Sequence, residues 1–113
     1  MSLSYTKSPL QTFTSMEQIK QVLRDTSDLF MVVVVLPDCQ LSEKQIIELR
    51  KYLHYHPNTR IYKIQVDEFN SNLPEDYRIQ RVPVVFKGQS AFGLRVGRND
   101  IMSVDELQQF MKV

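Results

Sequence analysis

The run Phe30–Leu36 (FMVVVVL) is the feature that most constrains the fold of this chain. It shows no alternation of apolar and polar side chains. A continuous β-branched run between turn residues is typical of a strand that is covered on both faces. Pro37 ends this strand, because proline has no N–H to donate to a neighbouring strand. The run therefore predicts the central strand of a sheet that carries helices on both sides.

The other hydrophobic patterns predict strands and helices that alternate along the chain. Capping boxes, in which the side chains of a serine and of a Gln or Glu three positions later satisfy each other's amides, precede two of the helices, at Ser15–Gln18 and Ser103–Glu106. The predicted elements are strand 10–13, helix 16–25, strand 30–36, helix 40–54, strand 60–66, a short helix within 67–76, strand 82–86, a turn at 87–90, strand 91–96 and a closing helix after Ser103. The order β-α-β-α-β-α-β-β-α predicts an α/β fold with a mixed sheet.

Length and composition fit one globular domain, residues 1–113, with residues 1–9 as an N-terminal extension. The net charge is +1 and the charges are interspersed, which gives no electrostatic footprint for nucleic acid. No apolar run approaches the roughly 20 residues of a membrane helix. We see no signal peptide, and the chain has one cysteine, so a reducing cytoplasm is the expected compartment.

The one cysteine, Cys39, follows the predicted central strand and precedes a predicted helix by one or two residues. Free amides and the dipole of a helix N-terminus place partial positive charge there, which lowers the pKa of a thiol. The neighbouring carboxylate of Asp38 has the opposite effect. From the residues alone, Cys39 is either a reactive thiol or a small buried hydrophobe.

Over about residues 10–112 the chain resembles the thioredoxin-like superfamily. The resemblance is carried by the element order, by Cys39–Ser42 (CQLS) after the central strand and by Val82–Gly88 (VPVVFKG). Residues 66–83 and Gly97 also match the family pattern. It implies that Cys39 is the nucleophilic thiol and that Pro83 follows a cis peptide bond and packs against that thiol. It also implies that the Val82 backbone pairs with a bound peptide or thiol substrate.

The departures from the family pattern disfavour a dithiol disulfide reductase. Thioredoxins have a tryptophan at the position of Asp38, a second cysteine at the position of Ser42, and a buried aspartate within the central strand. The C-x-x-S pattern is instead similar to that of monothiol glutaredoxins and bacilliredoxins. That similarity implies that Ser42 donates a hydrogen bond to the Cys39 thiolate, which attacks a mixed disulfide.

The same similarity implies a small thiol, such as glutathione or bacillithiol, as co-substrate, with protein thiols or disulfides as partners. We expect no bound cofactor, iron–sulfur cluster or metal. Val82, Pro83 and Asp38 are the expected substrate-binding residues, and Gly97–Asp100 matches the glutathione-binding segment only loosely. His54 and His56, two apart on a predicted helix, point away from each other and cannot share a metal ion.

The sequence leaves open whether the protein is an enzyme. The alternative is a catalytically inactive thioredoxin-like module that binds a protein partner through the groove between the Cys39 loop and Val82–Pro83. Asp38 fits this alternative. Ser42 likewise has a plain interpretation, as an N-cap or first-turn serine.

Overall fold

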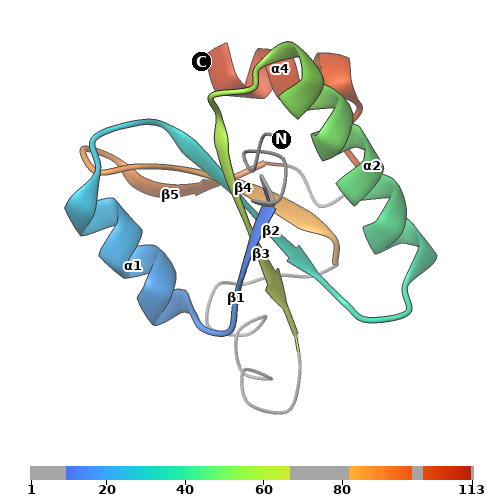
Figure 1. Ribbon diagram of the computed structural model, residues 1–113, viewed down its shortest axis with the longest axis horizontal. Coiled ribbons are helices and arrows are strands. Elements are labelled where there is room, and N and C mark those ends of the chain that lie inside the picture. The colour runs from blue at the N-terminus through green and yellow to red at the C-terminus, as the bar shows by residue number, and fades with distance from the viewer. Residues whose placement is uncertain (1–9, 67–81, 98–100, 113) are drawn as a thin grey trace, which may run out of the picture.

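The computed structural model describes residues 10–66, 82–97 and 101–112. They form a five-stranded sheet flanked by helices (Figure 1). The predicted extension 1–9 and the predicted helix within 67–76 lie outside these residues. The described elements are β1 (Leu10–Phe13), α1 (Met16–Asp25), β2 (Phe30–Val35), α2 (Gln40–Tyr55), β3 (Arg60–Gln65), β4 (Val84–Gln89), β5 (Gly93–Val96) and α4 (Val104–Lys112).

The strand order in the sheet is β1-β3-β2-β4-β5. Strands β1, β3 and β2 are parallel, whereas β4 runs antiparallel to β2, and β5 antiparallel to β4. Every residue of β2 is buried. The prediction of a central strand from the run Phe30–Leu36 is confirmed, although the strand ends one residue earlier, at Val35.

Successive side chains of β2 point to opposite faces of the sheet. Both faces are packed. Met31, Val33 and Val35 pack in a cluster that includes residues of α2 and α4. Phe30, Val32 and Val34 pack in a second cluster on the α1 side. Figure 1 shows α1 on one side of the sheet and α2 with α4 on the other. The predicted mixed α/β fold is confirmed.

Tyr62 interrupts the alternating pattern of β3 because β3 is an internal strand, covered on both faces. Its ring stacks on Phe13 of β1, with centroids 4.9 Å apart, and packs edge-to-face with Phe30 of β2, with centroids 5.5 Å apart. An internal strand therefore buries adjacent residues, here Ile61 and Tyr62.

The hairpin turn predicted at residues 87–90 is wrong. Strand β4 continues to Gln89 and β5 begins at Gly93, so the turn is formed by residues 90–92. Gly88 is a strand residue opposite Phe30, and the Phe30 ring fills the space where a side chain would lie. The turn uses Gly93 instead, whose φ of 71° is in the left-handed region that favours glycine.

Two side chains of α2 hold the start of α4. Gln45, which is fully buried, donates to the Met102 carbonyl at 3.0 Å and accepts from the Met102 N–H at 2.8 Å. Glu48 accepts from the Val104 N–H at 3.0 Å. The predicted capping box of residues 103–106 is confirmed, with both of its hydrogen bonds present. This network fixes α2, which carries the candidate site, against the other end of the chain.

Candidate functional site

Cys39 occupies the N-cap of α2, four residues beyond the end of the central strand β2 at Val35. Its backbone is extended, and its carbonyl accepts the N–H of Glu43 at 3.0 Å, which closes the first helical turn. The thiol is free and the residue is partly exposed. The structure therefore does not place Cys39 in a sealed apolar core, and the thiol lies where a helix presents unpaired amides.

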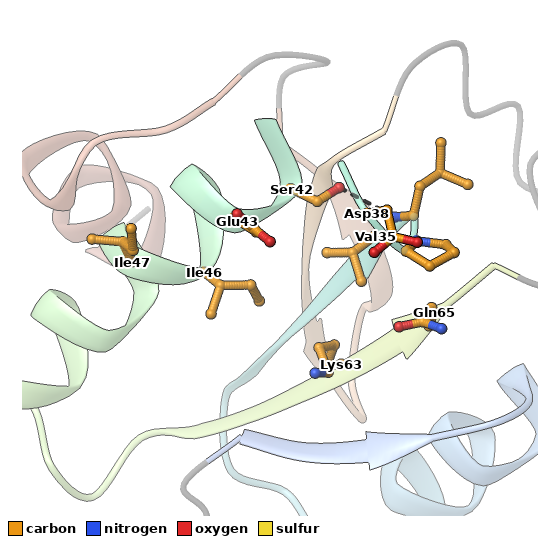
Figure 2. A pocket seen from close by; sticks show the side chains of 10 residues that line it. Val35, Asp38, Ser42, Glu43, Ile46, Ile47, Lys63 and Gln65 are labelled. Atoms are coloured by element: carbon orange, nitrogen blue, oxygen red, sulfur yellow. Dashed lines mark hydrogen bonds between the residues drawn. The ribbon is translucent and has the colours of Figure 1, made fainter. Parts of the chain in front are cut away.

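Ser42 connects the central strand to the thiol. It is almost fully buried, and its Oγ accepts a hydrogen bond from the Leu36 N–H at 3.1 Å (dashed line in Figure 2). A hydroxyl that accepts one hydrogen bond still has its proton to donate. The hydrogen bond from the Ser42 side chain to the sulfur is the main cause that lowers the pKa of Cys39 below its ordinary value. The amides of Ser42 and Leu41 act in the same direction.

The carboxylate that raises the pKa of Cys39 is Glu43, and not Asp38 as expected from the sequence. Partial burial and the charge of Glu43 both oppose the lowering of this pKa. Glu43 lies one helical turn after Cys39, so the two residues share a face of α2. Asp38 is exposed and has a φ of 54°, a left-handed conformation that aspartate tolerates better than most residues.

Of the two positions predicted for Ser42, N-cap or first turn, the structure shows the first turn, because the N-cap residue of α2 is Cys39.

The Val82–Pro83 peptide bond is cis. Pro83 is buried and Val82 is partly exposed. Strand β4 begins directly after them, and its first residue, Val84, pairs with Val34 near the end of β2. The antiparallel register therefore brings Val82 and Pro83 to the carboxyl end of β2, the end of the sheet from which the chain continues to Cys39.

Gly97 also contacts this end of β4, because its N–H donates to the Val85 carbonyl at 2.7 Å. A side chain at this position would meet that carbonyl oxygen and the sulfur of Met102, both 3.0 Å away. Of the loosely matched segment Gly97–Asp100, residues 98–100 lie outside the described part of the chain.

A pocket of about 450 Å³ opens beside the thiol loop (Figure 2). Ser42 and Glu43, which both act on the Cys39 sulfur, belong to its wall. The lining residues come from the end of β2 and the loop after it, from α2 and from β3: Val35, Leu36, Pro37, Asp38, Ser42, Glu43, Ile46, Ile47, Lys63 and Gln65.

Two residues of this site, Glu43 and Lys63, were missed by the sequence analysis. Helical spacing from Cys39 could have indicated Glu43, whereas Lys63 needed the strand order.

Replacing Ser42 with alanine is expected to raise the pKa of the Cys39 thiol, because the largest influence that lowers it is removed. The alkylation rate measured against pH reports this change as a midpoint that moves to higher pH. The matched control is Ser27→Ala, an exposed serine before β2, which should leave the midpoint unchanged. An unchanged midpoint in Ser42→Ala would make Ser42 a packing residue only.

The described residues show no sign of a metal site or of a membrane-spanning helix. Among residues 10–66, 82–97 and 101–112, no group of three or more His, Cys, Asp or Glu side chains could hold a metal ion. The ring of His56 stacks on Tyr52, with centroids 4.4 Å apart. Within the same residues, no helix has both the length and the apolar character needed to cross a bilayer.

The sheet order, the flanking helices and the position of Cys39 together define a thioredoxin-like α/β fold. No family model and no curated protein matches the sequence. The fold is similar to that of solved structures: chloroplastic thioredoxin z superposes with a TM-score of 0.76, at 17% identity over 91% of each chain. Mitochondrial thioredoxin 3 from Saccharomyces cerevisiae gives 0.75, at 14% identity over 91% of this chain and 93% of that one. Thioredoxin O2 from Arabidopsis thaliana gives 0.68, at 18% identity over 93% of each.

Proposed function

We propose that this protein is a monothiol thiol–disulfide exchange protein that acts through Cys39. The observation that carries the proposal is the partly exposed sulfur at the N-terminus of α2, with a pKa that the Ser42 hydroxyl lowers. The thiolate is the nucleophile in disulfide exchange, so a lowered pKa increases the reactive fraction at neutral pH. Thioredoxin-fold neighbours support a thiol–disulfide chemistry, with protein thiols or disulfides as partners.

The proposed reaction is an exchange without net oxidation. The Cys39 thiolate attacks the small-thiol sulfur of a protein mixed disulfide. A disulfide forms between Cys39 and the small thiol, the bond to the protein sulfur breaks, and the released protein thiolate takes a proton from water. A second molecule of small thiol then attacks the adduct as its thiolate. This gives the disulfide of the small thiol and restores the Cys39 thiolate.

The absence of a second cysteine from the sequence explains the need for the small thiol, because Cys39 has no internal resolving partner. Glutathione or bacillithiol is the proposed co-substrate, in a reducing compartment such as the cytoplasm. We propose that Val82 and Pro83 contact the substrate from the end of β4, with Asp38 on the loop before the thiol. We also propose that the chain forms one domain, with residues 1–9 as an N-terminal extension.

The test combines alkylation of Cys39 with adduct formation. We expect the rate of iodoacetamide labelling to rise with a midpoint below that of an ordinary thiol, about 8.5. Mass spectrometry after incubation with oxidised glutathione should show one glutathione adduct, which excess small thiol removes. The Cys39→Ser variant is the control and should show neither. A midpoint at or above the ordinary value, with no adduct, would refute the proposal.

The alternative function is a module that binds a protein partner at this site without chemistry. It is favoured by exposed apolar side chains near the thiol loop, because Leu36, Leu41 and Ile47 have exposed fractions of 40%, 52% and 52%. Partner binding that persists in Cys39→Ser and is lost in Leu41→Asp would support this alternative. In the exchange protein, substitution of Cys39 removes the covalent complex.

A further inference from the structure

Lys63 has no counter-ion within the described residues. It lies in the middle of β3 and, together with Gln65, lines the pocket beside the thiol loop (Figure 2). Its register neighbours are Thr12 of β1 and Val33 of β2, which carry no charge. Lys63 takes part in neither of the ion pairs Lys20–Glu17 and Lys51–Glu48. A partly buried ammonium group without an anion is stabilised by a carboxylate supplied from outside.

The same pocket carries negative charge on other elements. Glu43 of α2 and Asp38 of the preceding loop line it, and neither forms an ion pair with Lys63. Val35, Ile46 and Ile47 supply apolar lining. The pocket therefore presents an ammonium group and two carboxylates that form no ion pair with one another. Its volume, about 450 Å³, is within the range of roughly 300–1,000 Å³ that is typical of small-molecule sites.

We propose that this pocket binds the zwitterionic amino-acid end of a small thiol. Lys63 receives the carboxylate, and Glu43 with Asp38 receives the ammonium group. This inference rests on the proposed function, since the thiol end of the same ligand then exchanges with Cys39. Cys39 does not itself line the pocket, but two residues that do, Ser42 and Glu43, act on its sulfur, so the thiol end of a ligand anchored here has to extend past them to reach the reacting atom.

The pattern of charges disfavours simpler ligands. A thiol that carries only carboxylates would meet Glu43 and Asp38, and like charges at short range disfavour binding. A thiol that carries only an amine would leave Lys63 without its anion. A neutral thiol would use none of the three groups. The pocket therefore distinguishes small thiols by the charges at the end remote from sulfur.

Binding is tested without chemistry by titrating Cys39→Ser protein with S-methylglutathione and following backbone NMR shifts. We expect shifts at Lys63, Gln65 and Glu43, and affinity roughly tenfold weaker for (methylthio)acetate, which has only a carboxylate, and for S-methylcysteamine, which has only an amine. Adding Lys63→Met should weaken S-methylglutathione binding roughly tenfold, and adding Glu43→Gln several-fold. The matched controls Lys20→Met and Asp28→Asn remove the same charges from exposed sites and should leave binding unchanged.

The exchange reaction separates failure of this inference from failure of the proposed function. Wild-type protein is given oxidised glutathione and the neutral bis(2-hydroxyethyl) disulfide. Equal rates with both, together with no S-methylglutathione shifts at the pocket, would overturn the inference and leave monothiol exchange standing. Reaction with neither disulfide, together with pocket shifts that Lys63→Met abolishes, would overturn the exchange function and leave the zwitterion site standing.

Discussion

Replacing Gln45 with leucine is expected to lower the free energy of unfolding by about 3 kcal/mol, since two buried backbone groups lose their partners at roughly 1–3 kcal/mol each. Gln45 is fully buried and bonds both the N–H and the carbonyl of Met102, which is itself buried. Leucine has a similar volume, so the loss reflects unpaired polar groups and not a cavity.

Urea denaturation of wild type and variant measures this change, and an unchanged slope against urea concentration assigns it to the folded state. The matched control is Gln21→Leu. Gln21 is exposed on α1 and bonds only to the exposed residues Arg24 and Asp25, so a change within about 0.5 kcal/mol is expected. A similarly small change in Gln45→Leu would show that Met102 finds other partners.

Replacing Gly88 with alanine is expected to destabilise the protein by about 2–3 kcal/mol through overpacking. A Cβ atom at this position would lie closer than 3.0 Å to three atoms of the Phe30 ring. The ring cannot move aside cheaply, because Phe30 is fully buried and its ring packs edge-to-face with that of Tyr62.

A double-mutant cycle with Phe30→Leu identifies the cause. Leucine lacks the ring atoms that meet the new Cβ, so the double variant should be more stable than the sum of the two single changes indicates. Additive losses would place the cost elsewhere. Gly93→Ala is the contrasting variant: nothing lies within 4 Å of its Cβ position, and only the positive φ opposes alanine, at about 1–2 kcal/mol.

Both substitutions bear on the candidate site through α2 and β2. Gln45 lies on the helix that begins at Cys39, and it ties that helix to the segment before α4. Phe30 begins strand β2, which ends at Val35, four residues before Cys39. A destabilised variant that keeps the Cys39 alkylation midpoint of wild type would show that the first turn of α2 holds its own geometry.

Much of the fold was predictable because its strongest signals are local. The uninterrupted run of residues 30–36 can be stable only under two layers of cover, which made a central strand and flanking helices the expected arrangement. The capping serine and glutamate of residues 103–106 satisfy each other's amides within four residues, so the start of α4 needed no tertiary information. The hairpin was misplaced because Gly88 resembles a turn glycine until Phe30, far away in the sequence, is seen beside it.

The sequence by itself determined that one thiol stands between the central strand and a helix, and that no second cysteine can resolve its disulfides. Only the tertiary structure decided the environment of that thiol. Strand pairing leaves Lys63 beside uncharged neighbours, and helix α2 places Glu43 and the Ser42 hydroxyl around the sulfur. The physical reason is that electrostatic effects depend on distance in space, and residues 43 and 63 share a pocket only after β2, α2 and β3 have packed.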